Sequence, residues 1–395
     1  MTKKCLKAFC FALAFALCVG FSACDMSGTG GLGNSILDNS IGSSQSSDDQ
    51  SNGDQSSNSG AGDNVEDSSG SGSGDSSGGG VQEIADADFD VHFLQLGNKV
   101  SGDCTLIDIG DTEILIDAGS RTGSIGTIVP YIKKYCTDGI LEYVIVTHAH
   151  QDHIAGFTNS SSNGQGVFDN FVCQTIIDFP KTTVTSNLYK DYVALRDAEV
   201  ASGATHYTAL ECWNNANGAQ RSYDLGGNVS LDILYQKYYE QSTSEENNNS
   251  VCVMVSQGKN HYLFTGDLES SGEASLVENN ALPKCKLFKS GHHGSNTSNS
   301  DKLLSVIQPE IFVLTCCCGD SYGFPHQETI NTVAQYTDLV YAPLVATASA
   351  YELLNGNIVV QMVKGKVSVQ CSNNNTLFKD TDWFKNNRVT PDAWK

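Results

Sequence analysis

The pattern of hydrophobic and polar positions changes sharply near residue 90. Beyond it, short apolar runs rich in β-branched residues alternate with Gly and Asp turns, which predicts strands. The expected strands lie at 91–96, 104–109, 112–117, 141–146, 229–235, 250–255, 261–265, 286–289, 311–316, 350–354, 358–363 and 367–371. Helical periodicity predicts helices at 125–135, 187–201 and 327–336. Strands that are partly consecutive and partly separated by helices indicate an α/β domain in which helices cover sheets.

Before this domain, residues 24–88 show no such pattern. They are rich in Ser, Gly, Asp and Asn and contain almost no large apolar side chain. A segment of this composition cannot bury enough surface to offset the entropy of ordering its chain. We therefore expect a disordered tether, followed by one folded domain at residues 89–395.

The first 23 residues have the composition of a targeting segment. Three lysines precede an apolar run from Ala8 to Phe21, which is too short to span a membrane comfortably. Small residues then precede Cys24, in the order Phe-Ser-Ala-Cys. This arrangement is similar to a bacterial lipoprotein signal and predicts cleavage before Cys24, a lipid on its thiol and a location on the extracytoplasmic face of the cell membrane. An ordinary secretory signal is the alternative.

Charge and cysteine content narrow the classes of function. The formal net charge is −22, and no basic residue lies between Asp25 and Asp90. An acidic chain repels phosphate backbones, so a nucleic-acid substrate would have to be recruited by a local site. The 14 cysteines include no C-x-x-C pair. We interpret those of the folded domain, including the run Cys316–Cys318, as small buried hydrophobic residues.

The strongest candidate for chemistry follows the strand expected at 141–146. His148, His150, Asp152 and His153 lie within six residues of one another, in a chain with nine histidines in total. Imidazole and carboxylate groups together suit Zn, Mn or Fe. A polar loop with chance histidines is the alternative, and the local density of histidine disfavours it.

Three further motifs follow expected strands or begin the last expected helix. Phe264-Thr265-Gly266-Asp267 ends a strand on a Gly and a carboxylate, a pattern that by itself is more often a turn. The stretch 289–295 reads KSGHHGS and contains His292 and His293. The stretch 322–327 reads YGFPHQ and contains His326. These motifs and the first one contain most of the histidines of the chain.

The motif HAHQDH resembles the H-x-H-x-D-H signature of the metallo-β-lactamase superfamily. Asp117 in LIDAG and Asp267 in FTGD match two further aspartates of that superfamily. More narrowly, HFLQLG, SGDCTLI, GHHGS and YGFPHQE are similar to the extracellular hydrolase domain of ComEC-type competence proteins. The resemblance spans roughly residues 91–341, with the motifs in the expected order. It implies an αββα sandwich.

The resemblance also implies a site with two divalent metal ions, Zn or Mn. His148 and His150 would hold the first ion, and Asp267 would bridge both. The second ion would be held by Asp152, His153 and His292, with His293 as the alternative to His292. Metals there would activate a water as nucleophile. Residues implied in catalysis are Asp152, His293 and His326, the last two as donors to a leaving group.

Two residues are expected to support the ligands, and two departures from the family pattern bear on the site. Asp117 would accept a ring N–H and so fix the orientation of a ligand. Asn249 stands where other members of the superfamily have a third histidine, which implies a weaker first metal position; His206 is a remote alternative. Phe324 stands where ComEC-type proteins often have a His, leaving His326 alone in its motif.

The expected function is metal-dependent hydrolysis, first of all as a phosphodiesterase or nuclease acting on external DNA. Another wall-side ester or phosphodiester, such as a teichoic-acid decoration, is the rival substrate, and the ComEC-like motifs disfavour β-lactams. A surface binding protein with the same fold but no turnover is the rival from a different class, and the intact set of ligands argues against it. The sequence indicates no protein partner.

Overall fold

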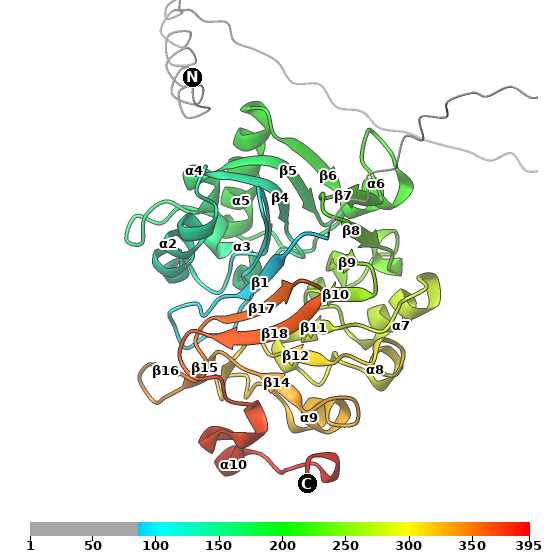
Figure 1. The fold of residues 1–395 in the computed structure, drawn as a ribbon. Helices are drawn as coiled ribbons and strands as arrows, with labels where there is room; N and C mark the ends of the chain where they lie inside the picture. The colour runs from blue at the N-terminus through cyan, green and yellow to red at the C-terminus, as the bar shows by residue number, and fades with distance from the viewer. Residues whose placement is uncertain (1–85) are drawn as a thin grey trace, which may run out of the picture. The chain divides into compact units, whose positions relative to one another are not determined.

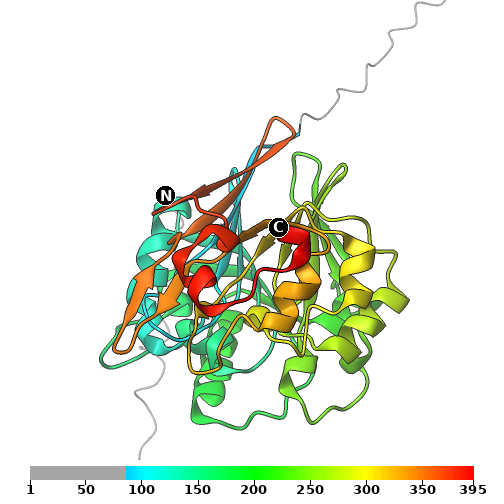
Figure 2. The same cartoon turned by 90° about the horizontal axis from the view of Figure 1, so that it is seen from below.

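Two β-sheets lie face to face at the centre of the domain, with helices on their outer sides (Figures 1 and 2). This computed structural model describes residues 86–395. The predicted signal peptide, Cys24 and the predicted tether up to residue 85 lie outside the described residues. Among the helices that are described, none has the length and apolar character needed to cross a membrane.

The first sheet combines an antiparallel and a parallel half. The strands from β18 to β3 are antiparallel, whereas β3 to β6 are parallel to one another. Its strands are, in spatial order, β18 (Lys366–Cys371), β17 (Ile358–Val363), β1 (Phe89–Phe93), β2 (Thr105–Ile109), β3 (Thr112–Ile116), β4 (Ile140–Ile145), β5 (Val172–Asp178) and β6 (Thr205–Thr208).

The second sheet repeats this division. The strands from β7 to β10 are antiparallel, and those from β10 to β14 are parallel. In spatial order they are β14 (Leu339–Tyr341), β12 (Ile311–Val313), β11 (Leu287–Lys289), β10 (Asn260–Phe264), β9 (Cys252–Gln257), β8 (Val229–Leu234) and β7 (Ser222–Asp224). A small third sheet consists of β13 (Cys317–Cys318), β15 (Leu344–Ala346) and β16 (Tyr351–Leu353).

Helices from the two halves of the chain cover opposite faces of the pair of sheets, as Figure 2 shows. The first group packs beside the first sheet and comprises α2 (Ile125–Tyr135), α3 (Gln151–Ile154), α4 (Val167–Asn170) and α5 (Asn187–Ala201). The second group packs beside the second sheet and comprises α7 (Ser270–Asn279), α8 (Asp301–Ile307) and α9 (Gln327–Val333). The remaining helices are α6 (Ala209–Asn214) and α10 (Asp382–Asn387). This layering confirms the predicted αββα sandwich.

The core between the sheets is apolar and aromatic. The Phe89 ring of the first sheet meets Tyr262 of the second, with ring centroids 5.1 Å apart, and Phe93 meets Phe264 at 6.4 Å. β8 shows how the sequence dictates this packing, because its residues alternate between buried and half-buried along VSLDIL. Cys316–Cys318 are all buried, as predicted, and the Cys316 and Cys318 sulfurs lie 3.7 Å apart.

The start of the described chain is tied to a turn of each sheet, β7–β8 in the second and β17–β18 in the first. The Ala87 N–H donates to the Gly227 carbonyl at 3.0 Å, and the Lys364 N–H donates to the Asp88 carboxylate at 2.7 Å. β17 pairs with β1 along its whole length. The hairpin of β17 and β18 therefore extends the sheet beside the first strand.

Candidate metal centre

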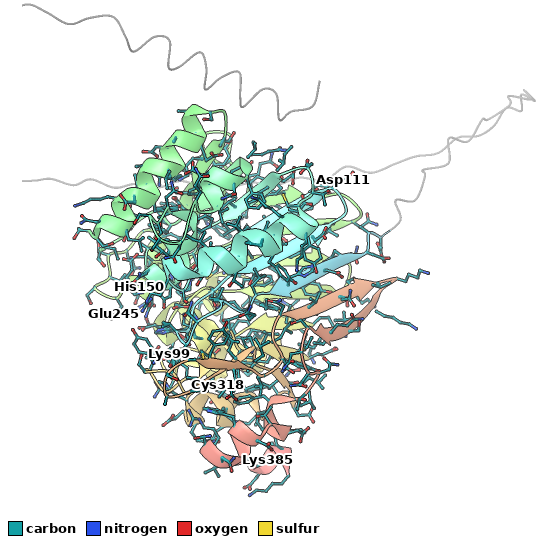
Figure 3. The ribbon with its side chains drawn as sticks, turned by 90° about the vertical axis from the view of Figure 1, so that its left-hand side faces the viewer. Lys99, Asp111, His150, Glu245, Cys318 and Lys385 are labelled. Atoms are coloured by element: carbon teal, nitrogen blue, oxygen red, sulfur yellow. The ribbon has the colours of Figure 1, made fainter. Side chains whose placement is uncertain are left out.

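The predicted site residues lie where strands of both sheets end. The segment from His148 to His153 follows β4, Asp267 follows β10, and His292 and His293 follow β11. These strands belong to the parallel parts of the two sheets, so their carboxyl ends open on one edge of the sandwich. In Figure 3, His150 lies at this edge, and Asp111, in the turn between β2 and β3, lies at the opposite side.

Four of the predicted residues form one compact group. Asp152, His153, Asp267 and His293 each present a ligand atom, and all four atoms lie within 4.8 Å of one another. His153 Nε2 is 3.1 Å and His293 Nε2 is 3.3 Å from Asp267 Oδ2. His293 Nε2 also lies 3.5 Å from Asp152 Oδ2.

Two atoms of this group show that it suits a cation. Asp267 Oδ1 and His293 Nε2 are buried, and neither has a hydrogen-bond partner within the described part of the chain. Buried polar atoms are costly when unpaired, and clusters of imidazole and carboxylate are a common ligand set for divalent metals. The donor set therefore fits a divalent ion among these four side chains.

His148 and His150 lie beside this group. His148 Nε2 is 3.0 Å from His150 Nδ1 and 3.9 Å from Asp267 Oδ2. His148 is fully buried, whereas His150 is half-buried and faces the pocket described below. Asp267 is therefore near both the group of four and the His148–His150 pair, as a bridging ligand would be.

The two consecutive histidines at 292 and 293 face the site differently. His293 is buried and belongs to the group of four, whereas His292 Nε2 is 3.9 Å from Asp267 Oδ2 and the ring is 20% exposed. His292 Nδ1 meets the Thr297 hydroxyl at 3.0 Å. Both residues have positive φ angles, of 47° and 54°, which is unusual for non-glycine residues and often found at functional sites. The geometry favours His293 for the position that the sequence assigned first to His292.

The pKa values of Asp267 and of the histidines around it depend on one another. Burial would raise the pKa of Asp267, but His153 and His293 outweigh it and hold the pKa well below its usual value. Burial opposes protonation of His153 and His293, yet Asp267 raises the pKa of each well above the ordinary histidine value. Burial and the nearby His153 lower the pKa of His148. A metal ligand must release its proton, so metal binding here is coupled to proton release.

Close backbone contacts hold the His148–His153 loop in place. The Asp103 N–H donates to the Asp152 carbonyl at 3.1 Å, and the Ala118 N–H donates to the His153 carbonyl at 2.8 Å. A Cβ at Gly119 would lie 1.5 Å from the Asp152 carbonyl oxygen, so only glycine fits there. The close contact between these two backbone segments therefore explains the Gly in the motif LIDAG.

Hydrogen bonds at Nδ1 orient both histidines of the group. Asp117 Oδ2 lies 2.8 Å from His153 Nδ1, the orienting contact that the sequence suggested for Asp117. His293 Nδ1 donates to the Thr315 carbonyl at 3.1 Å and lies 3.2 Å from Asp103 Oδ1, and Asp103 also forms an ion pair with the buried Lys289. Asp103 and Lys289 were not predicted as site residues, although they lie in the motifs SGDCTLI and KSGHHGS.

Glu246 holds the same loop from the other side. Its carboxylate accepts from the Ala149 N–H at 3.2 Å and from the Thr183 N–H at 2.7 Å. Asn249 donates its amide to Glu246 at 3.0 Å, and it lies outside the group of four. Asn249 therefore contacts the histidine loop through Glu246. Glu246 was not predicted as a site residue, because it lies in no motif and its partners are distant in sequence.

His326 and His206 lie outside the group. The Asn296 N–H donates to His326 Nδ1 at 3.0 Å, so His326 Nε2 carries a proton and donates it to the Tyr322 carbonyl at 3.1 Å. Both ring nitrogens of His326 are thus bonded to backbone groups, and the residue connects two loops. His206 lies on β6, and its Nε2 is 2.8 Å from Oδ1 of Asp178 at the end of β5.

The fold and this donor set resemble those of metallo-β-lactamase-fold domains. Residues 97–160, which include Asp103, Asp117 and the His148–His153 loop, match the family described as the metallo-beta-lactamase superfamily. A solved structure of a metallo-beta-lactamase fold protein, YhfI from Bacillus subtilis, is 11% identical and covers 69% of this chain and 99% of its own, with a TM-score of 0.40.

Three curated relatives are competence or recombination proteins by name. Recombination protein 2 of Haemophilus influenzae is 25% identical over 73% of this chain, and the match covers 32% of that protein. ComE operon protein 3 of Bacillus subtilis is 28% identical over 24% of this chain and 12% of its own length. Competence protein ComA of Neisseria gonorrhoeae is 27% identical over 34% of this chain and 20% of its own length.

The chain thus spans about a third or less of the length of these relatives. Together with the family match, they confirm the predicted resemblance to metallo-β-lactamase-fold domains of competence proteins.

Proposed function

We propose that this chain is an exported, lipid-anchored phosphodiesterase that uses two divalent ions, Zn or Mn, to hydrolyse DNA outside the membrane. The observation that carries the proposal is the group of Asp152, His153, Asp267 and His293, in which a buried nitrogen and a buried oxygen have no hydrogen-bond partner among the described residues. The likeness to competence proteins supports nucleic acid as the substrate class.

Side chains of this chain would hold two ions on either side of Asp267. His148 and His150 lie on one side, while Asp152, His153 and His293 lie on the other. Ions held there would supply a Lewis acid for a phosphoryl oxygen and would lower the pKa of a water nucleophile. The Asp117 carboxylate and the Thr315 carbonyl keep the rings of His153 and His293 turned toward Asp267, with Asp103 beside His293. His292 is 20% exposed and lines the pocket with its Nε2 3.9 Å from Asp267 Oδ2, so it can exchange a proton with a leaving group.

The test compares Asp267→Ala with Asp111→Ala, which removes a carboxylate at the opposite side of the domain (Figure 3). Metal content is measured by elemental analysis, and hydrolysis is measured on bis(4-nitrophenyl) phosphate and on single- and double-stranded DNA with Mn or Zn added. We expect Asp267→Ala to lose metal and to lose at least about 100-fold in rate, because removing even a supporting residue costs 10- to 100-fold. Asp111→Ala should retain both the bound metal and the rate of hydrolysis.

Three results would contradict this proposal in different ways. Full activity of metal-depleted Asp267→Ala would show that hydrolysis comes from elsewhere. Hydrolysis of the simple diester without cleavage of DNA would favour a wall-side substrate such as a teichoic-acid decoration. Bound metal with no turnover of any ester would favour a surface binding protein with the same fold.

The membrane anchor is proposed from the sequence alone, because Cys24 lies outside the described residues. Cys24→Ala should block lipid attachment and release the protein from the membrane fraction. The matched control is Cys18→Ala, which changes a cysteine in the apolar run and leaves the expected cleavage site intact. If Cys24→Ala stays in the membrane fraction to the same extent as the control, the anchor is not at this residue.

A further inference from the structure

A pocket of about 310 Å³ opens over the metal centre. Asp152, Asp267 and His292 line it on the side of the ligands, and Arg121, Tyr322 and Phe324 line it as well. The volume lies at the lower end of the range for small-molecule sites. The proposed chemistry gives Arg121 and Tyr322 no role.

Tyr322 is an aromatic side chain held in an exposed position. It is 59% exposed, and its ring is stacked on Phe324 with centroids 5.5 Å apart and planes inclined by 18°. Phe324 is only 5% exposed and packs in turn against His292 at 5.7 Å and His293 at 6.0 Å. A continuous column of rings therefore runs from the ligand histidines to solvent, and Tyr322 is its outermost member.

The loop that carries Tyr322 is fixed by hydrogen bonds on several sides. The Tyr322 N–H donates to Asp320 Oδ1 at 3.0 Å, and the Tyr322 carbonyl accepts from His326 Nε2 at 3.1 Å. Arg388 donates to the next carbonyl, that of Gly323, at 2.7 Å. Because the aromatic ring is already positioned, a flat ligand that stacks on it loses little binding energy to ordering this loop.

Arg121 is the cation of this pocket. Apart from histidines, the other charged residues that line it are Asp152 and Asp267. Arg121 donates one Nη1–H to the Ser120 carbonyl at 2.8 Å and forms no ion pair with any other described residue. Its remaining guanidinium donors are available for a bidentate contact with a phosphate. In a chain of net charge −22, such a local cation is what allows a polyanion to approach.

We infer that Tyr322 and Arg121 form a nucleotide subsite, in which a base stacks on Tyr322 and a phosphate flanking the scissile bond contacts Arg121. The inference rests on the proposed phosphodiesterase function and narrows it to single-stranded nucleic acid, whose bases can leave the stack. A polyol phosphate without bases gains nothing from the aromatic column. Tyr322 and Arg121 are thus specificity residues for unpaired nucleotides.

The experiment measures binding of two labelled oligomers to the full chain in Mn by fluorescence anisotropy. One is a phosphorothioate-linked oligothymidine, which resists cleavage, and the other is a matched oligomer with abasic sugars. One base stacked on an aromatic ring should give the wild-type protein about a 5- to 150-fold preference for oligothymidine. Tyr322→Ala should lose the preference but keep its affinity for the abasic oligomer, whereas Tyr322→Phe should retain the preference.

Arg121 is tested with the same oligomers. Arg121→Gln should weaken binding of both to a similar extent and should reduce the salt dependence by about one counter-ion. Arg221→Gln is the matched control, because Arg221 lies on another part of the surface with its guanidinium over the Trp213 ring at 3.6 Å. That control should change neither affinity nor salt dependence by a comparable amount.

The outcomes separate this inference from the proposed function. The stacking role of Tyr322 would be overturned if the wild-type protein bound the two oligomers with equal affinity. It would also be overturned if Tyr322→Ala weakened the affinity for both oligomers equally. Unchanged binding by Arg121→Gln would overturn the phosphate contact. If the simple diester is hydrolysed in a metal-dependent way and neither oligomer binds, the nucleotide subsite is refuted and the phosphodiesterase stands. If no diester is hydrolysed but oligothymidine is preferred, the phosphodiesterase is refuted and the nucleotide subsite stands.

Discussion

The buried ion pair between Lys289 and Asp103 provides the sharpest test of how the centre is stabilised. Both side chains are 2% exposed. Burial would raise the pKa of Asp103, but Lys289 and then His293 outweigh it and hold the pKa below its usual value. The carboxylate is therefore charged at neutral pH, and Lys289 is its principal partner. Replacing Lys289 by methionine keeps an unbranched side chain one atom shorter and removes the charge.

Removing one partner of a buried ion pair costs about 3–5 kcal/mol, because the other charge is left uncompensated. We expect Lys289→Met to lower the free energy of unfolding by an amount in this range, moderated by the remaining contact of Asp103 with His293 at 3.2 Å. The double variant Asp103→Asn with Lys289→Met removes both charges. It should recover about half or more of the loss, because no isolated charge remains buried.

Stability is measured by urea unfolding in chelator, followed by the fluorescence of the tryptophans, so that metal binding does not contribute. Asp111→Asn, at the opposite side of the domain, controls for loss of a carboxylate as such. The reasoning would be refuted if Lys289→Met cost less than about 1 kcal/mol, the level of an exposed pair. It would also be refuted if the two substitutions were additive, because additivity means that the two charges do not interact.

Burial lowers the pKa of His92 to about 4. The unfolded chain takes up this proton first, so stability should fall by about 3 kcal/mol as pH drops from about 6.5 to 4, and His92→Phe should flatten urea midpoints over that window. Burial, then the charge of Glu142, raises the pKa of Glu113 to about 8. Its stabilising contribution is therefore lost as pH rises from about 4.5 to 8, and Glu113→Gln should be more stable than wild type above pH 8 but not below pH 4. Glu246→Gln should weaken Mn binding about 10- to 100-fold in a titration, because the His148–His150 loop loses a charged anchor, and unchanged affinity would show that this anchor is dispensable.

Local sequence signals predicted much of the fold. The helices at 125–135 and 187–201 and the strand at 358–363 have the predicted bounds. The strand expected at 311–316 ends at Val313, and Cys317–Cys318 join the third sheet instead. β5 at Val172–Asp178 was missed, although it is central to the parallel half of the first sheet. Its pairing with two other strands, rather than a distinct local pattern, decides its structure.

The site shows the same division between local and distant information. The motifs identified Asp152, His153, Asp267 and both histidines of GHHGS, because ligands on tight loops are close together in sequence. Which of the two consecutive histidines enters the group depends on left-handed backbone at both, which residue types alone do not reveal. Glu246 was missed because its contacts, with Ala149 and Thr183, are formed only once the two sheets pack together.

The pairing of β1 with β17 has a consequence for how the protein is made. β1 is among the first segments of the domain to leave the ribosome, and β17 is among the last, yet they are hydrogen-bonded neighbours. Until β17 arrives, one edge of β1 carries unpaired backbone groups, and such edges invite pairing with other chains. Closing so long a loop also slows folding. A nascent chain of this domain therefore spends its synthesis with an open sheet, and a chain that stops before residue 358 keeps that edge exposed for good.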